Sequence, residues 1–282
     1  MHLINKIFNN EMVRTVWDRE KEKYYISIVD IVGILTESKN PQIYWRVMKK
    51  RLRDEGNETV TNCNGLKLKA KDGKYRMTDV CDIEGMFRII ESIPSKNAEP
   101  IKIWLAKLGK ERIDEFFDPT ISVQRSIDLY RTKGYNEDWI AKRIKALQDR
   151  NKLTDVWKDN GIETSIEYGI LTNEIYKNWA EMIAKEYKEY KGLRKENLRD
   201  NMTDIEVALT DLGEIATREL AREHKPYGIK QNKKIAEAGG QVAKTARDDL
   251  EQKLGRTVIS KKNRLNYKYI DNVKELKESN DD

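Results

Sequence analysis

The pattern of hydrophobic and polar residues predicts four short β-strands near the start of the chain, three of them by alternation with a two-residue period. Residues 12–17 alternate in this way, and after a charged connection residues 24–28 carry the aromatic and β-branched residues that favour a strand. Residues 66–69 and 74–77 form a second pair around Asp72-Gly73, a sequence typical of hairpin turns. The pattern predicts two β-hairpins in a small antiparallel sheet, which needs helices packed on one face to be stable.

The helical spacing of apolar residues predicts two short helices between these hairpins. Ser27 can accept a hydrogen bond at the start of a helix that continues to Leu35. Asn40 can cap a second helix, in which Pro41 occupies the first position, where proline loses no hydrogen bond. This second helix is expected to bury one apolar stripe, made of Tyr44, Val47, Met48 and Leu52.

Two further helices are predicted after the second hairpin. Thr78-Asp79 is expected to begin a helix in which Val80, Ile83, Phe87 and Ile90 recur at helical spacing. A longer helix is predicted over residues 98–117, ending before Asp118-Pro119, the clearest break in the chain. The apolar residues of this longer helix that should pack on the sheet are Ile101, Trp104, Leu105 and Leu108.

Strand signals stop after Pro119, and only helical patterns follow. Amphipathic helices are predicted over residues 122–132, 136–148, 172–190 and 203–222, the last opening with the capping-box sequence Thr203-Asp204-Ile205-Glu206. The sequence therefore predicts an α+β N-terminal domain over residues 1–118, with a small antiparallel sheet and packed helices, and an all-α domain over residues 119–270. Residues 271–282 are polar and are expected to form a disordered tail.

Composition limits the classes of protein to which the chain can belong. Its 282 residues carry 54 Lys and Arg against 48 Asp and Glu, a formal net charge of +6, and suffice for two domains. The two cysteines, Cys63 and Cys81, have no C-x-x-C partner, so a disulfide framework and a cysteine-based zinc site are not expected. Because no apolar stretch has the length of a signal peptide or a membrane span, we expect a cytoplasmic protein without membrane partners.

The charge of the second predicted helix is one-sided. Six Lys or Arg and no Asp or Glu occur from Lys39 to Arg53. Two short helices joined by a tight turn, the second of them basic, are how a helix-turn-helix presents a helix to the DNA major groove. The alternative is an ordinary amphipathic helix whose Lys and Arg are only solvated, which a basic run by itself does not exclude.

The predicted DNA contacts come from this helix and from the exposed side of the second hairpin. Gln42 and Arg46, near the helix start, are the candidates for reading base edges. The other candidates on the helix are Trp45, Lys49, Lys50 and Arg53. The candidates on the hairpin are Lys67, Lys69, Lys74 and Arg76.

A second basic region follows His224. Residues 224–265 contain eleven Lys or Arg and four acids. Gly239-Gly240 could let backbone amides approach a phosphate, but a break in the helix is the favoured interpretation, since no phosphate-loop motif surrounds the pair. The candidates for a second nucleic-acid or partner surface are Lys225, Lys230, Lys233, Lys234, Lys244, Arg247, Lys261 and Lys262.

The sequence contains no recognisable motif for catalysis or metal binding. It has two histidines, His2 and His224, and neither has an evident nucleophile beside it. Asp79, Asp82 and Glu84 are interpreted as carboxylates that complement a helix dipole, since no histidine completes a metal site. We therefore expect no catalytic residue, no bound metal and no cofactor, and a metal-dependent nuclease stays open as an alternative.

Several motifs of the first half occur in a characteristic order. They are Arg14-Thr15-Val16-Trp17, residues 25–32, Tyr44-Trp45 followed by Lys49-Lys50-Arg51-Leu52, residues 66–69, Thr78-Asp79-Val80, and Ala98-Glu99-Pro100 followed by Trp104-Leu105-Ala106. Together they resemble the N-terminal domain of the BRO family, which occurs in baculovirus repeated-ORF proteins and in phage and prophage antirepressors. The resemblance extends over residues 1–118 and implies an α+β DNA-binding module.

Other motifs lie in the second half. They include residues 209–221, His224-Lys225-Pro226-Tyr227-Gly228, Ala238-Gly239-Gly240 and residues 246–251. Over residues 203–265 the chain is similar to the C-terminal region of the DNA-damage-inducible protein D family. This resemblance implies a role in the response to damaged DNA, the SOS response, through DNA or through recombinase filaments.

The main functional hypothesis is a non-enzymatic DNA-binding protein of the prophage-antirepressor or DNA-damage-inducible type, acting in transcription regulation. Its expected partners are DNA, a recombinase or repressor protein, and a second copy of the chain, because readers of this kind often pair two half-sites. The alternative is a modulator of the damage response that acts mainly by protein contact with recombinase filaments.

Overall fold

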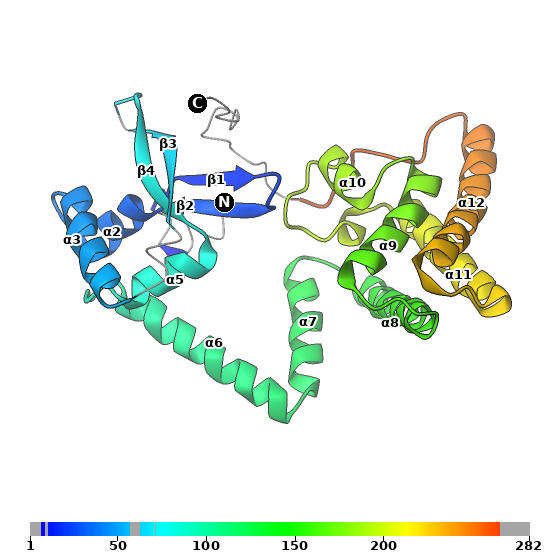
Figure 1. Ribbon diagram of the computed structural model, residues 1–282, viewed down its shortest axis with the longest axis horizontal. Coiled ribbons are helices and arrows are strands. Elements are labelled where there is room, and N and C mark those ends of the chain that lie inside the picture. Colours follow the sequence, from blue (N-terminus) through cyan, green and yellow to red (C-terminus); the bar gives the residue numbers. More distant parts are fainter. Residues whose placement is uncertain (1–6, 9–10, 57–62, 71, 266–282) are drawn as a thin grey trace. The chain divides into compact units, whose positions relative to one another are not determined.

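The computed structural model describes residues 7–8, 11–56, 63–70 and 72–265. Over these residues the chain forms a small four-stranded antiparallel sheet and is otherwise mostly helical (Figure 1), which confirms the predicted mixture of α and β structure. Contacts divide the chain after Ser122 into two compact units. The division falls in helix α7 (Thr120–Thr132), shortly after the predicted boundary at residue 118. The predicted tail, residues 271–282, lies outside the described residues.

The sheet of the first unit consists of the two predicted hairpins. Strands β1 (Thr15–Asp18) and β2 (Lys23–Ser27) form the first, and β3 (Asn64–Lys69) and β4 (Tyr75–Cys81) form the second. The strand order is β1-β2-β4-β3, and every neighbouring pair is antiparallel. The second hairpin therefore adds to the first through β4.

The end of β4 differs from the prediction. Residues 78–81 continue the strand, and helix α5 (Ile83–Glu91) begins only after Asp82, whose Oδ1 accepts a hydrogen bond from the Gly85 amide at 3.0 Å. Thr78 and Val80 lie on one side of the sheet with the period of a strand, and pairing of Cys81 with Ile26 extends β4 up to the cap. The prediction of a helix from Thr78 is therefore wrong. Val80 fits the helical spacing of Ile83 and Phe87 as well as the period of a strand, so the apolar pattern alone did not separate the end of β4 from the start of α5.

Helices α2 (Ile28–Thr36) and α3 (Pro41–Asp54) confirm the two predicted helices between the hairpins. The Ser27 hydroxyl accepts a hydrogen bond from the Asp30 amide, and the Asn40 side chain accepts one from the Ile43 amide at 3.2 Å. Buried residues of α2, α3 and α5 form the core of this unit with those of β2 and β4.

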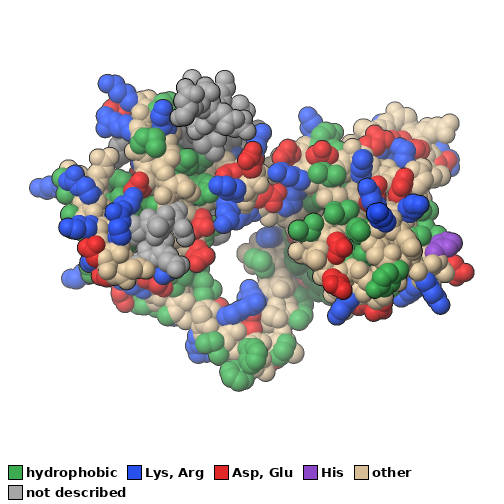
Figure 2. All heavy atoms as spheres, viewed as in Figure 1, with side chains coloured by type: hydrophobic (Ala, Val, Ile, Leu, Met, Phe, Trp, Pro, Cys, Tyr) green, Lys and Arg blue, Asp and Glu red, His purple; other side chains and the backbone are tan. Residues whose placement is uncertain are grey.

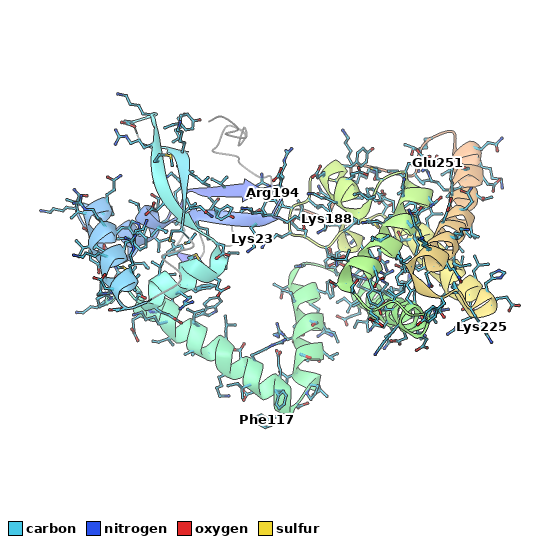
Figure 3. The ribbon with its side chains drawn as sticks, in the orientation of Figure 1. Lys23, Phe117, Lys188, Arg194, Lys225 and Glu251 are labelled. Carbon is cyan, nitrogen blue, oxygen red and sulfur yellow. The ribbon has the colours of Figure 1, made fainter. Side chains whose placement is uncertain are left out.

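Helix α6 (Glu99–Phe117) packs on α5, and the prediction that its apolar residues pack on the sheet is wrong for Trp104 and Leu108, whereas Ile101 and Leu105 join the core that includes residues of the sheet. Ile101 is buried, but the side chains of Trp104 and Leu108 are 43% and 40% exposed. The Trp104 ring contacts the Phe87 ring of α5, with centroids 5.9 Å apart. Beyond this contact the helix leaves the core, and its last residue, Phe117, projects from its end (Figure 3).

The second unit is helical over its described residues. Besides most of α7, it contains α8 (Glu137–Asp159), α9 (Ser165–Ala180), α10 (Ala184–Tyr190), α11 (Asp204–His224) and α12 (Gly228–Leu254), with a 3₁₀ turn (Arg199–Asn201). The helix predicted over residues 172–190 is in fact two, because Glu181 adopts a left-handed conformation (φ 60°) that ends α9. The capping box of Thr203 and Glu206 is confirmed.

Gly239 and Gly240 lie inside α12, so both the predicted helix break and the phosphate-binding alternative are wrong. The pair instead allows close helix packing. A Cβ on Gly239 would lie 2.6 Å from the backbone nitrogen of Thr217 in α11, and a Cβ on Gly240 would lie 2.9 Å from the Ile175 carbonyl oxygen in α9. Such distances are shorter than side chains tolerate, so α12 can contact both helices only because these residues are glycine.

Candidate nucleic-acid interface

The orientation of α3 is set by three buried residues. Trp45, Met48 and Leu52 face the core, whereas the predicted stripe included Tyr44 and Val47. Val47 is 65% exposed, so the stripe is rotated relative to the prediction. The rotation follows from Trp45, whose large ring is only 4% exposed. The prediction of Trp45 as a DNA contact is therefore wrong, because its ring is part of the core.

One carboxylate fastens α3 to strand β4. Asp79 Oδ2 accepts hydrogen bonds from Trp45 Nε1 at 2.7 Å and from Lys49 Nζ at 2.6 Å. Burial raises the pKa of Asp79, but the hydrogen bonds from Lys49 and Trp45 and the charge of Lys49 together hold it below its ordinary value. Asp79 is therefore ionised at neutral pH and neutralises Lys49.

This contact corrects two sequence interpretations. Lys49 was predicted as an outward DNA contact, and the structure pairs it with a carboxylate of its own chain. Asp79 was interpreted as complementing a helix dipole, whereas only Asp82 and Glu84 lie at the start of α5 as expected. The signal that could have revealed Asp79 is its place in β4, because a carboxylate on the helix-covered face of a sheet requires a donor.

Three cations of α3 point outward from the protein. Arg46, Lys50 and Arg53 are exposed, and no Asp or Glu of the described chain lies within ion-pair distance of them. Arg51, on another side of the helix, lies 3.7 Å from Glu55 and donates to the Ser92 carbonyl. Figure 2 shows Lys and Arg side chains gathered over α3 and around the end of the β3–β4 hairpin. Gln42, the other predicted base reader, is also exposed, at the start of α3.

The hairpin extends this charge on one face. The register pairs Lys67 with Met77 and Lys69 with Tyr75, and strand alternation places all four on the same face as Asp79. That is the face against which α3 lies. Both lysines are exposed, and neither has an ion-pair partner among the residues that the structure describes. We call the outward cations on this side of the unit the basic face: Arg46, Lys50, Arg53, Lys67 and Lys69.

The other two hairpin candidates do not belong to the basic face. Arg76 pairs with Leu68 across the hairpin and so lies on the opposite face, where its guanidinium is 2.5 Å from Asp72. Lys74 is exposed between Gly73 and β4. Of the ten predicted DNA contacts, the structure therefore brings five together, with Gln42 beside them.

The second predicted basic surface is divided by contacts within the protein. Arg247 is buried in α12 and donates to the Trp179 carbonyl at 3.0 Å and to Glu251. Lys233 pairs with Glu174 at 3.4 Å, and Lys244 pairs with Glu181 at 2.8 Å. The prediction is wrong for Arg247, since its guanidinium joins α12 to α9.

The other residues of the second predicted basic surface are exposed. Lys225 stands at the end of α11 (Figure 3), and Lys230 and Lys234 follow on α12, all three without an ion-pair partner among the described residues. Lys261 Nζ lies 5.5 Å from the centroid of the Tyr190 ring, and Lys262 is exposed beside it. These cations come from separate parts of the unit.

A buried ion pair that no sequence pattern indicated holds the end of the described chain. Lys191 Nζ donates to Glu206 at 2.8 Å and to the carbonyls of Ser260 and Lys262 at 2.9 and 2.8 Å, with both charged side chains fully buried. Glu206 also accepts from the Tyr187 hydroxyl at 2.7 Å. All three protons of the ammonium group have acceptors, so the pair is fully hydrogen-bonded.

No group of three His, Cys, Asp or Glu that could hold a metal ion occurs in the described part of the chain. His224 is exposed at the end of α11, and His2 lies outside the described residues. No helix formed by the described residues has the length and apolar character needed to cross a membrane.

The chain matches no protein-family model and no curated protein. The resemblance to the BRO family and to the DNA-damage-inducible protein D family therefore stays a prediction from sequence motifs. The function has to follow from the geometry and charge of the basic face.

Proposed function

We propose that the first unit binds duplex DNA through the basic face, without enzymatic activity. The observation that carries this proposal is that Arg46, Lys50 and Arg53 project from α3 without a carboxylate of the described residues at ion-pair distance. Lysines and arginines with no acidic partner release counterions from DNA when they meet its phosphates, which favours binding. An amphipathic helix whose Lys and Arg are only solvated would expose the same side chains. An experiment therefore has to distinguish that helix from one that binds DNA.

The geometry supports different roles for the start of α3 and for the other residues of the basic face. Helix α3 has 14 residues and is preceded by the short helix α2, an arrangement suited to the major groove. Gln42 and Arg46 lie near its start, where residues of a reading helix contact base edges, and both types form paired hydrogen bonds with bases. Lys50, Arg53 and the hairpin lysines then contact phosphates, which set register without reading sequence.

The wider role that we propose is a cytoplasmic transcription regulator of the prophage-antirepressor or DNA-damage-inducible type. It rests on the motif resemblances together with the basic face. In this proposal the second unit binds a repressor or recombinase partner, and two copies of the chain bind paired half-sites.

The test is the salt dependence of binding to a duplex oligonucleotide, measured by fluorescence anisotropy. In the variant Arg46→Ala/Lys50→Ala/Arg53→Ala, the slope of log affinity against log salt should be shallower by about 1.8, because the lost phosphate contacts of Lys50 and Arg53 each remove about 0.9. The matched control is Lys142→Ala/Lys145→Ala/Lys158→Ala, which removes three exposed cations of α8. Both variants lose the same charge, so an effect of net charge alone would be equal in the two.

Equal slopes for the α3 variant and the α8 variant would refute the proposal. A third variant, Lys225→Ala/Lys230→Ala/Lys234→Ala, measures the contribution of the second set of exposed cations. A larger loss in this variant than in the α3 variant would move the principal DNA contact to the second unit.

A further inference from the structure

The two cysteines of the chain lie opposite one another at the base of the β3–β4 hairpin. The register pairs Gly65 with Asp79 and Asn64 with Val80, so its next step places Cys63 opposite Cys81. The two side chains also belong to the same apolar core, in which Cys81 is buried and Cys63 half-buried. Two independent observations, the register and the shared core, therefore bring the sulfur atoms to one side of the sheet.

The backbone at this place has the dimensions that a disulfide needs. Opposed residues of antiparallel strands have Cα atoms about 4.5–5.5 Å apart. Disulfides span Cα separations of about 4.4–6.8 Å. A bond between Cys63 and Cys81 therefore requires rotation of side chains and no rearrangement of the strands.

The two thiols differ in reactivity. Burial raises the pKa of Cys63 to about 11, with smaller opposing effects of the Lys49 and Asp79 charges. Burial raises the pKa of Cys81 further, and a negative charge on Cys63 adds to this effect. Cys63 is the more exposed and the more acidic of the two, so it ionises first and reaches an oxidant first.

We propose that Cys63 and Cys81 are a dithiol pair that a peroxide oxidises to an intrachain disulfide, which makes the base of the hairpin a site of reversible modification. The Cys63 thiolate attacks one oxygen of hydrogen peroxide, an S–O bond forms, the O–O bond breaks, and the leaving hydroxide takes up a proton to become water. The sulfur of Cys81 then attacks the Cys63 sulfenic acid, an S–S bond forms, and the S–O bond breaks. The leaving hydroxide takes the Cys81 proton, so two thiols and one peroxide give one disulfide and two waters.

The bond would change the unit in a defined place. It would join the start of β3 to the end of β4, two positions along the strand from Asp79, the residue that fastens α3. A cross-link of this kind restricts the unfolded chain and stabilises the folded one. This inference does not rest on the proposed DNA binding and can succeed or fail without it.

The experiment uses the full chain, treated with hydrogen peroxide, quenched with N-ethylmaleimide under denaturing conditions, and analysed by intact mass and peptide mapping. The expected product is a monomer that has lost two hydrogens, carries no maleimide, and yields a peptide joined through Cys63 and Cys81. Its Tm should rise by at least about 5 °C and return to the original value on reduction. The oxidation rate should increase about tenfold per pH unit between pH 7 and pH 9, because the thiolate fraction of Cys63 grows in that proportion.

Two variants serve as controls. Cys63→Ser and Cys81→Ala each leave one thiol, so neither should lose two hydrogens or gain stability in peroxide. The proposal would be overturned if the wild-type chain gave a sulfinic acid on Cys63 while Cys81 remained open to maleimide. Disulfide-linked dimers as the main product would also overturn it.

Discussion

Asp79 offers the sharpest test of how the basic face is built, because one oxygen of its carboxylate holds both Trp45 and Lys49. The substitution Asp79→Asn keeps an oxygen that can accept the Trp45 Nε1 hydrogen bond but removes the charge opposite Lys49. Folding and DNA binding should then respond in opposite directions. The chain should lose stability, while the released ammonium group becomes available to a phosphate.

The loss of stability can be bounded from the geometry. The Lys49–Asp79 contact is 2.6 Å long, and the two side chains are 26% and 31% exposed. Buried charged hydrogen bonds contribute about 1.5–3 kcal/mol, and exposed ion pairs about 0.2–1 kcal/mol. For this partly exposed pair we expect the free energy of unfolding to fall by about 1 kcal/mol. The gain of one phosphate contact should make the salt slope of DNA binding steeper by about 0.9.

The same residue predicts a pH dependence with a definite sign. Because the folded chain holds the pKa of Asp79 below its ordinary value, the contact contributes stability above the unfolded-state pKa of about 3.9. That contribution is lost as the pH falls through the lower folded-state pKa. The difference in stability between wild type and Asp79→Asn should therefore be full at neutral pH and vanish in acid.

Urea unfolding followed by tryptophan fluorescence measures the first effect, and anisotropy of a labelled duplex over a range of salt measures the second. The control is Asp114→Asn, which removes the partner of Lys110 on α6, away from the basic face. An unchanged salt slope in Asp79→Asn, together with the expected loss of stability, would refute the argument that α3 presents this side to DNA. If the salt slope steepened equally in Asp79→Asn and Asp114→Asn, the change in DNA binding would be an effect of net charge.

Two further predictions concern the second unit. Lys191→Met should lower the free energy of unfolding by about 3–5 kcal/mol in urea titration, because it leaves the Glu206 carboxylate buried without a counter-charge, and adding Glu206→Gln should restore much of the loss. Gly239→Ala should destabilise the chain by at least about 1–3 kcal/mol, since the new methyl group meets the backbone of Thr217. Gly109→Ala, at an open position of α6, should instead stabilise it by about 0.5–1 kcal/mol, and equal effects in these two alanine variants would contradict the packing argument.

Local signals explain what could be predicted for this chain. Asn40-Pro41 and Thr203-x-x-Glu206 mark the starts of α3 and α11 because caps act within one turn of their helix. Asp72-Gly73 marks the β3–β4 hairpin because a tight turn depends on the conformation of its own residues. The one-sided charge of α3 is likewise a property of consecutive residues, and three of its predicted contacts are indeed exposed cations.

The partners of side chains were decided by tertiary structure. Asp79 meets Lys49 across thirty residues of sequence, and Lys191 meets the Ser260 carbonyl across sixty-nine. Arg247, similar in sequence context to its exposed basic neighbours, is buried because α12 turns that side toward α9. The amino-acid sequence by itself determined the elements and their caps, since these depend on residues a few positions apart. Which cations remain open to a ligand depends on contacts between distant segments, and only the folded chain creates those.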